Sequence, residues 1–328
     1  MSPKVHVGAV PHRARFRERC GDRLTFNGCG VGGSDMSEKP VWERDGRDWP
    51  NREASRFVRA AGIRWHVQRA GSGPVLLLVH GTGAATHSWR ALLPLLARDY
   101  TVVAPDLPGH GFTDTPSASL LSLPGMARAL GELLQVLGVQ PEIVVGHSAG
   151  AAILARMCLD GTIAPRALVS LNGAMLPLRG LPGHIFAPIA RLVVSIPLTR
   201  RMFAWQAADR RVVERMLRST GSTIEPAGVD QYVRIARCPA HAGAALAMMA
   251  NWDLRPLERD LPRLRTHLLL ITGSNDRTIP PSDSARVQAL VPGAELVSLP
   301  GLGHLAHEEQ PARIATLVRG FATTAAAA

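Results

Sequence analysis

Short apolar runs recur along the chain and alternate with longer segments that carry apolar residues at helical spacing. Six runs rich in Val, Leu, Ile and Ala predict buried strands: 75–79, 101–104, 143–145, 167–171, 267–273 and 294–299. Between them, residues 123–137 repeat apolar positions with a helical period, and residues 282–290 form another helix-like segment. Strands that alternate with helices predict an α/β fold with a mostly parallel, doubly wound sheet.

A different pattern precedes this series. Residues 56–60 and 63–69 alternate on either side of Ala61-Gly62. Two alternating runs joined by a two-residue turn predict an antiparallel hairpin, which we place at the edge of the sheet.

The alternation of strands and helices stops in residues 175–257, which are rich in Ala, Leu, Met, Arg and Pro. Helix-like runs near 185–194, 211–218 and 242–249 predict a helical cap inserted into a core of residues 36–174 and 258–322. The bulky apolar residues of the cap are Phe186, Met202, Phe203, Trp205, Met216, Tyr232, Met248, Met249 and Trp252. Most should pack the cap onto the core, and the remainder should line a roomy apolar pocket.

The two ends of the chain differ from the rest. Residues 1–35 hold six basic and three acidic residues, several glycines and no periodic apolar pattern, so we expect them to be disordered. They lack the continuous apolar core of a signal peptide. Organised sequence begins near Pro40, which makes Met36 a candidate start, and we expect a disordered tail at 323–328.

The segment Gly146-His147-Ser148-Ala149-Gly150 directly follows the apolar run 143–145 and leads into the helix-prone run 151–157. Gly-x-Ser-x-Gly between a strand and a helix is the sequence form of a nucleophile elbow, a sharp turn that exposes a serine hydroxyl. The five-residue pattern alone is common, but its position here favours Ser148 as a nucleophile.

A nucleophilic serine needs a base and an acid, which follow it in the order acid, then histidine, in folds with this elbow. Asp276 lies just past the strand 267–273, and His304 lies in the loop after the last strand. Loops at the carboxyl ends of parallel strands gather at one edge of the sheet, so we expect these side chains to meet Ser148 there. The imidazole would take the serine proton, and the carboxylate would orient the imidazole.

Other residues compete for these roles. Asp106, Asp253 and Asp283 are alternatives for the acid, but the loop position favours Asp276. An acid one strand earlier would fall at Asn172, which cannot stabilise an imidazolium as a carboxylate does. His307 is an alternative base, but it lies in a helix-like stretch with two glutamates and is expected on the surface. His80, His110 and His147 should shape the loops around the site.

Acyl transfer also needs donors for the developing oxyanion. The turn His80-Gly81-Thr82-Gly83 follows the strand 75–79, and its glycines would let the amide of Thr82 point at that oxygen beside the amide of Ala149. The mechanism needs no ion or cofactor, and no cluster of His, Asp or Glu has metal-ligand spacing.

Composition limits the possible partners and compartment. The net charge is +11, yet only two of the 37 basic residues are lysines, and no basic cluster is interleaved with aromatics, which argues against nucleic-acid binding. Such a surface would still attract acidic substrates or anionic lipid headgroups, so a peripheral contact with a membrane stays open. Four cysteines without metal spacing indicate a reduced, cytoplasmic compartment. No apolar run reaches the roughly 18–20 residues of a membrane span.

With these motifs together, the chain resembles an α/β-hydrolase from about residue 40 to residue 321. A serine nucleophile separates it from the haloalkane dehalogenases and epoxide hydrolases, which carry aspartate there. Segments 49–55, 80–89, 146–152 and 170–174 resemble a narrower group, the magnesium-chelatase accessory hydrolases of bacteriochlorophyll biosynthesis. That resemblance implies a role in tetrapyrrole metabolism near magnesium insertion. The chain lacks a phosphate-binding loop, so it is not the motor of the chelatase.

Three functions remain open at this point. The first is a serine hydrolase that cleaves an ester of a bulky apolar molecule, of which a porphyrin ester is one example. The second is a non-catalytic accessory protein that binds a porphyrin or a magnesium-chelatase subunit. The third is an unrelated carboxylesterase or carbon–carbon bond hydrolase on the same scaffold. The sequence reveals neither the substrate nor the oligomeric state.

Overall fold

The computed structural model describes residues 38–177 and 197–327. The predicted N-terminal extension 1–35 and the helix-like run 185–194 lie outside the described residues. Within them, the strands are β1 (Ser55–Ala60), β2 (Ile63–Ala70), β3 (Val75–Val79), β4 (Thr101–Pro105), β5 (Ile143–His147), β6 (Ala167–Leu171), β7 (His267–Gly273) and β8 (Glu295–Leu299).

These strands form one sheet in the order β1-β2-β4-β3-β5-β6-β7-β8. The pairs β1–β2 and β2–β4 are antiparallel, and every later pair is parallel. Because β5 pairs with β3 on one side and β6 on the other, the carboxyl end of β5 lies at the middle of the sheet. The predicted α/β fold with a mostly parallel, doubly wound sheet is therefore confirmed.

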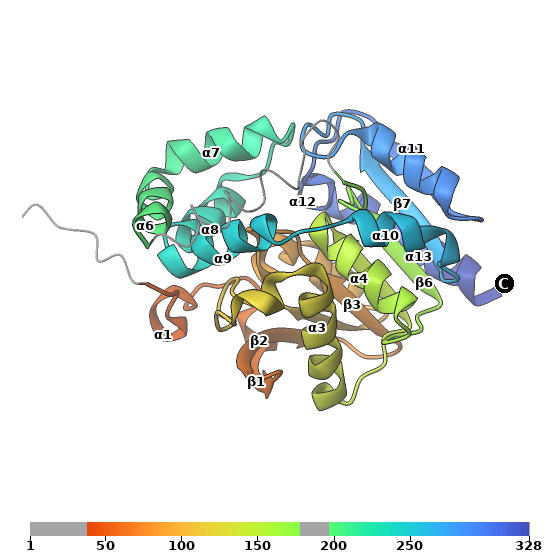
Figure 1. The fold of residues 1–328 in the computed structure, drawn as a ribbon, viewed down its shortest axis with the longest axis horizontal. Helices are drawn as coiled ribbons and strands as arrows, with labels where there is room; N and C mark the ends of the chain where they lie inside the picture. The colour runs from red at the N-terminus through yellow and green to blue at the C-terminus, as the bar shows by residue number, and fades with distance from the viewer. Residues whose placement is uncertain (1–37, 178–196, 328) are drawn as a thin grey trace, which may run out of the picture. The chain divides into compact units, whose positions relative to one another are not determined.

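Helices cover both faces of this sheet (Figure 1). One layer contains α3 (Leu123–Leu137), α4 (Ala149–Leu159), α10 (Arg255–Asp260) and α11 (Pro281–Leu290); the other contains α2 (Leu92–Leu96) and α13 (Pro311–Ala327). Alternate residues of β3 enter the two layers, with Leu77 and Val79 on the α3–α4 side and Leu76 and Leu78 on the α2–α13 side. The strand sequences are apolar throughout because both faces are buried.

The edge hairpin forms as predicted. Ala60 pairs with Ile63, and the two turn residues, Ala61 and Gly62, both have positive φ, at 51° and 74°. This is the backbone of a two-residue turn whose twist matches that of the flanking strands. Glycine accepts such a φ without strain, whereas Ala61 does not.

Five α-helices lie between β6 and β7 in the described chain. One is α10, which packs in the core layer, and the other four are α6 (Pro197–Gln206), α7 (Arg210–Ser219), α8 (Pro226–Ala236) and α9 (Pro239–Ala250). These four are drawn in green to cyan in Figure 1 and form the cap region. The helix-like runs 211–218 and 242–249 fall within α7 and α9. Five of the bulky cap residues do not pack inward, because Met202, Phe203, Trp205, Met216 and Met249 are exposed. Tyr232 and Met248 are buried, and Phe186 lies outside the described residues.

The remaining elements are short. They are α1 (Trp42–Asp45), α12 (Ala306–Glu309) and the 3-10 helices η1 (Arg52–Ala54), η2 (Thr86–Trp89), η3 (Ala118–Leu121) and η4 (Leu261–Arg263). The predicted disordered tail is wrong for residues 323–327, which continue α13. Alanine has the highest helix propensity, and Ala325 is buried against the core. Across 38–177 and 197–327, no helix combines the length and apolar character required to cross a bilayer.

Candidate active site

Ser148 lies at the turn between β5 and α4, as the elbow pattern predicts. Its backbone has φ 51° and ψ −119°, an unusual conformation for a residue with a side chain. The two flanking glycines are required by close packing. A Cβ on Gly146 would lie 2.4 Å from the amide nitrogen of Ala151, and a Cβ on Gly150 would lie 2.1 Å from the carbonyl oxygen of Val79. The turn therefore holds the serine in a strained position at the centre of the sheet edge.

Asp276 and His304 meet in the loops that follow β7 and β8. The Nδ1 atom of His304 lies 2.8 Å from Oδ2 of Asp276, and both residues are buried. The other carboxylate oxygen, Oδ1, accepts hydrogen bonds from the backbone amides of Thr278 at 2.8 Å and Ile279 at 2.9 Å. These amides fix the rotation of the carboxylate, so Oδ2 faces the imidazole. The pair has the geometry of an acid that orients a histidine base.

His304 is also tied to the residue that precedes Ser148. The Nε2–H of His147 donates to the backbone carbonyl of His304 at 2.9 Å, and the two rings lie 4.8 Å apart. Burial, reinforced by His307 and His304, lowers the pKa of His147 well below its ordinary value, so the ring is neutral. The Ser148 hydroxyl makes no hydrogen bond within the described part of the chain. A nucleophile–base contact is often long before substrate binds.

The predicted oxyanion donors lie on two elements that touch at the elbow. Ala149 is the first residue of α4, where a backbone N–H has no partner inside the helix. A Cβ on Gly81 would lie 2.8 Å from the Cβ of Ser148, so the turn after β3 passes directly against the serine. The Thr82 hydroxyl donates to the sulfur of Met248 in α9 at 3.4 Å. Thr82 therefore contacts the cap through its side chain.

Asn172, which follows β6, has a role that the sequence did not reveal. Its amide donates to Oδ2 of Asp276 at 2.8 Å and to the carbonyl of Gly303 at 3.3 Å. Its φ is 47°, in a region that asparagine accepts better than most residues. Asn172 thus binds the carboxylate of Asp276 from the end of the neighbouring strand. Asn172 follows β6, and Asp276 follows the neighbouring strand β7. This shared position after paired strands was the signal in the sequence that could have predicted the contact.

His307 is not on the surface, contrary to the prediction. It is 1% exposed, and its ring lies 4.4 Å from that of His147. Its Nε2–H donates to the Ser88 hydroxyl at 2.7 Å, and that hydroxyl donates to Oε1 of Glu308 at 2.8 Å. Burial lowers the pKa of His307 to about 3. These two hydrogen bonds satisfy Nε2 of His307 and Oε1 of Glu308 inside the protein, whereas Nδ1 of His307 has no partner within the described residues.

Glu308 connects this network to the cap. Tyr232 of α8 donates its hydroxyl proton to Oε1 of Glu308 at 2.7 Å, and Arg90 forms an ion pair with Oε2. Arg90 also pairs with Glu225, at the start of α8, at 2.9 Å. Burial raises the pKa of Glu308, although Arg90 opposes the shift, and burial beside Glu308 raises the pKa of the Tyr232 hydroxyl well above its ordinary value. A buried charge cluster thus joins the cap to the core near the base.

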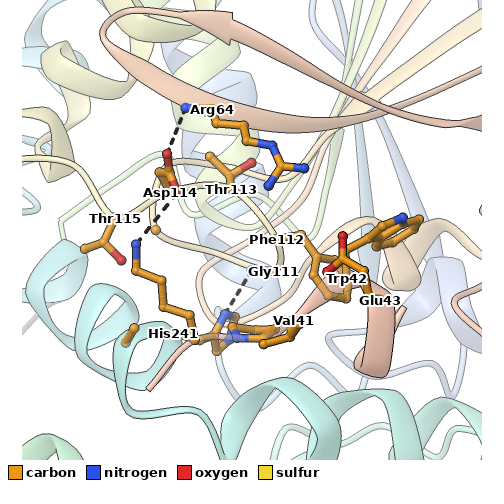
Figure 2. A pocket seen from close by; sticks show the side chains of 14 residues that line it. Val41, Trp42, Glu43, Arg64, Gly111, Phe112, Thr113, Asp114, Thr115 and His241 are labelled. Atoms are coloured by element: carbon orange, nitrogen blue, oxygen red, sulfur yellow. Dashed lines mark hydrogen bonds and ion pairs between the residues drawn. The ribbon is translucent and has the colours of Figure 1, made fainter. Parts of the chain in front are cut away.

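His241 forms a second bridge between cap and core. Its Nδ1 accepts from the amide of Gly111 at 3.1 Å, and its Nε2–H donates to the carbonyl of Gly83, in the turn after β3, at 3.2 Å. Burial lowers its pKa to about 4, so the ring is neutral, as this pair of bonds requires. The same ring lines the hollow in Figure 2.

That hollow is not the roomy apolar pocket expected from the sequence, because neither Ser148 nor His304 nor any of the bulky apolar cap residues lines it. Its volume is about 270 Å³, below the roughly 300–1,000 Å³ typical of small-molecule sites. Its wall includes the Lys39–Asp114 ion pair, with a distance of 3.7 Å, and the charged residues Glu43 and Arg64. Figure 2 shows the ring of Phe112 beside Trp42, on the other side of the hollow from Asp114. It is a polar hollow, lined in part by His241.

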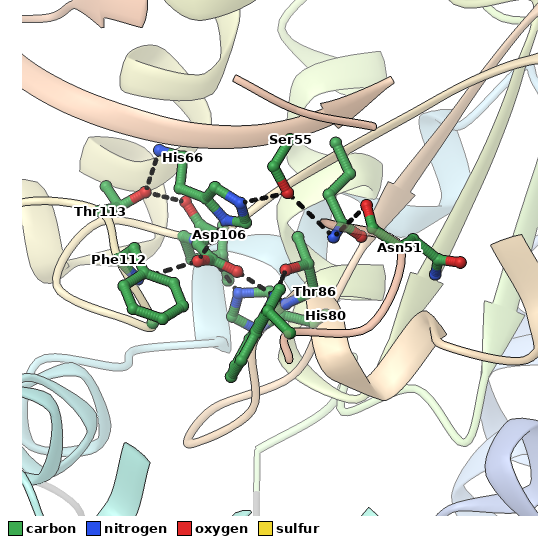
Figure 3. A network of polar contacts seen from close by, with 12 residues as sticks. Asn51, Ser55, His66, His80, Thr86, Asp106, Phe112 and Thr113 are labelled. Atoms are coloured by element: carbon green, nitrogen blue, oxygen red, sulfur yellow. Dashed lines mark hydrogen bonds and ion pairs between the residues drawn. The ribbon is translucent and has the colours of Figure 1, made fainter. Parts of the chain in front are cut away.

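Asp106, one of the competing acids, belongs to a separate buried network (Figure 3). His66 bridges it to Ser55, with 2.8 Å to the carboxylate and 3.0 Å to the hydroxyl. Burial alone would raise the pKa of Asp106, but the His66 contact and the amide of Phe112 lower it well below its ordinary value. These residues have the composition of a catalytic triad, yet Asp106 and His66 are fully buried. The carboxylate instead holds the loop 106–113 by accepting from the amides of Thr86 and Phe112.

No group of three or more His, Cys, Asp or Glu side chains in residues 38–177 and 197–327 is arranged to hold a metal ion. Asp253 and Asp283 lie elsewhere, bonded to Arg255 and Arg286 respectively. Of the four candidate acids, Asp276 is the one that contacts His304, which in turn contacts His147 beside Ser148.

Comparisons with known proteins agree with this architecture. The model of the alpha/beta hydrolase family matches residues 76–317. The magnesium-chelatase 30 kDa subunit of Rhodobacter capsulatus is 40% identical over 263 residues, which cover 80% of this chain and 92% of that protein. A 2-hydroxy-6-oxo-2,4-heptadienoate hydrolase of Pseudomonas putida is 27% identical over 83% of this chain and 97% of its own. An alpha/beta hydrolase fold protein from Burkholderia ambifaria superposes with a TM-score of 0.69 at 25% identity, over 81% of this chain and 97% of its own.

Proposed function

We propose that this chain, which belongs to the alpha/beta hydrolase family, is a serine hydrolase that transfers an acyl group to water through Ser148, His304 and Asp276. The observation that carries the proposal is the 2.8 Å bond between His304 and Asp276 at the sheet edge where Ser148 is held in a strained turn. A purely structural serine would not need that conformation, which costs of order 1–3 kcal/mol.

In the proposed reaction, Ser148 attacks the carbonyl carbon of an ester while His304 takes the hydroxyl proton through Nε2. The tetrahedral intermediate collapses, and the imidazolium gives that proton to the leaving alcohol. Water then attacks the acyl-enzyme, with His304 again acting as the base. The amides of Thr82 and Ala149 would stabilise the oxyanion in both steps, each worth about 3–4 kcal/mol of transition-state stabilisation.

Labelling with a fluorophosphonate tests this activity directly, because the probe reacts with an activated serine. We expect wild type to be labelled on the peptide that contains Ser148, and Ser148→Ala to remain unlabelled. The Ser55→Ala variant is a matched control, since Ser55 also contacts a His–Asp pair but should not react. Equal labelling of wild type and Ser148→Ala would contradict the proposal.

We further propose that the substrate or partner belongs to the metal-insertion step of magnesium–porphyrin synthesis, in the cytoplasm. The 40% identity to a protein named as a magnesium-chelatase subunit supports this placement. A porphyrin carboxylic ester would then be the substrate, and the chelatase subunits would be the partners. Porphyrin methyl esters should be cleaved with a higher kcat/KM than short aryl esters. The absence of that preference would remove the porphyrin ester from the proposal.

The second candidate is a non-catalytic accessory role, which the name of the same relative favours. Complementation separates the two, because a holder of porphyrin or of a chelatase subunit needs no nucleophile. If Ser148→Ala supports magnesium insertion in cells as well as wild type, the accessory role holds and catalysis is dispensable. If it fails while still folding and binding porphyrin, the enzymatic role holds.

A further inference from the structure

The cap helix α6 presents an apolar stripe to solvent. Leu198, Met202 and Trp205 follow one another at the i, i+4, i+7 spacing that places them on one side of the helix. They are 73%, 49% and 69% exposed, whereas Ala204, on another side of α6, is fully buried. Isolated exposed apolar residues are ordinary, but three large ones in line on one short helix are not.

The same segment of the cap is rich in positive charge. Residues 197–219, which span α6 and α7, contain six arginines and two acidic residues. Arg211 and Arg215 lie four residues apart on the exposed side of α7, and within the described chain neither forms an ion pair. Arg201 is adjacent to the stripe on α6 and pairs only with the equally exposed Glu38 at 3.0 Å. The cap surface is therefore both apolar and cationic.

We propose that this α6–α7 surface, formed by the apolar stripe and these arginines, docks onto an anionic lipid bilayer. A helix with apolar and aromatic residues beside arginines lies at the membrane interface, with the apolar side among the acyl chains and the guanidinium groups at the phosphates. Tryptophan prefers that depth because its ring is apolar and its N–H is polar. Figure 1 shows α6 and the start of α7 together at one end of the cap, from which α7 runs back toward the loops that follow β7 and β8.

Charge complementarity favours lipid over a second copy of this chain. A symmetric dimer through the α6–α7 surface would bring the arginines of the two copies together, and like charges oppose association. Anionic headgroups instead attract each basic residue. The inference goes beyond the proposed hydrolase activity, since it concerns where the cap sits and not what Ser148 does.

Trp205 provides a local probe of this contact. Trp49, Trp65 and Trp89 are buried, Trp42 and Trp252 are half-buried, and Trp205 is 69% exposed. We expect the full chain to co-sediment with vesicles of phosphatidylcholine and about one-third phosphatidylglycerol, and to bind pure phosphatidylcholine much less. Lipids brominated on their acyl chains should quench the fluorescence, and Trp205→Phe should bind equally well but lose most of the quenching.

Two double variants test the two halves of the surface. Leu198→Ser/Trp205→Ser and Arg211→Glu/Arg215→Glu should each weaken the partition coefficient at least tenfold, and raised salt should weaken wild type but affect the arginine variant little. Val136→Ser/Arg128→Glu is the matched control, because it removes an exposed apolar residue and reverses an exposed charge on α3, a core helix outside the α6–α7 surface. It should bind within twofold of wild type.

Several outcomes would overturn the docking surface. One is vesicle binding that both double variants retain. Another is a Trp205 that is shielded from acrylamide in free solution, which would mean that another part of the chain, a second copy or a protein already covers α6. Sedimentation velocity of wild type and Leu198→Ser/Trp205→Ser would identify the second copy. Ser148→Ala should bind vesicles like wild type, so a failure of the hydrolase proposal leaves this result intact.

Discussion

Replacing Asn172 tests the contribution of its hydrogen bond to Asp276, which the sequence did not predict. The Asn172 amide donates to Oδ2 of Asp276 at 2.8 Å, the same oxygen that faces His304 at 2.8 Å. A hydrogen bond to a charged group contributes about 1.5–3 kcal/mol. His304 becomes cationic in the transition state of the proposed reaction. A misplaced Asp276 carboxylate would therefore destabilise the transition state more than the enzyme–substrate complex. We therefore expect kcat/KM to fall about 10- to 100-fold, mainly through kcat.

The choice of substitution matters because Asn172 has a φ of 47°. Asn172→Ala would remove the amide and also add backbone strain of about 1–2 kcal/mol, whereas Asn172→Gly removes the amide without that strain. The two variants should lose the same activity and differ in their free energy of unfolding. An aryl ester serves as substrate, and urea unfolding gives the stability.

Moving the carboxylate from position 276 to position 172 provides a second test. Asp276→Asn alone should lower kcat by about 10³–10⁴, because an amide would favour the wrong histidine tautomer. Adding Asn172→Asp supplies a carboxylate from the neighbouring strand and should restore part of the loss. If Asn172→Gly stays within twofold of wild type while Asp276→Asn is inactive, the two backbone amides suffice to hold the acid and the reasoning about Asn172 is refuted.

Three further predictions concern stability. Ala61→Gly should raise the free energy of unfolding by about 0.5–1 kcal/mol, because the hairpin turn needs positive φ there, and urea denaturation will show no gain if the strain is absent. Tyr232→Phe should lower it by about 1.5–3 kcal/mol by removing one of the three side-chain donors to the buried carboxylate of Glu308, and a change below 0.5 kcal/mol would contradict this. The native pKa of His241 lies at about 4, below its unfolded value, so its contribution is complete above about pH 6.5 and lost as the pH falls to 4. His241→Gln should therefore flatten the fall in stability over that range by about 3 kcal/mol; identical slopes in both proteins would count against the assignment.

Much of the fold was predictable because its signals are local. Runs such as 143–145 and 167–171 are apolar on both faces of a strand, and residues 123–137 carry the helical period, so periodicity alone places them. The elbow was predictable for the same reason, since strand, glycine, serine, glycine and helix are consecutive. Asp276 and His304 followed from their positions after strands, because parallel strands bring their carboxyl ends to one edge.

The burial of individual side chains was less predictable. His307 precedes two glutamates, a pattern typical of a surface helix, yet it is buried. Ser88, from a distant segment, forms a hydrogen bond with His307, and Tyr232 of the cap forms one with Glu308. The bulky residues of α6 have the composition of a pocket lining, yet they face solvent. Hydrophobicity describes what a side chain prefers, and only the packed neighbours decide whether that preference is met.

By itself, the sequence determined the order of strands and helices along the chain, the strained serine turn and the residues able to serve as acid and base, because each depends on neighbours a few positions away. Tertiary structure alone decided that Asn172 holds the acid, that Asp106 serves a different histidine and that the cap joins the core through Glu308 and His241. These contacts join residues 40 or more positions apart, where hydrogen bonding and burial depend on how whole elements pack.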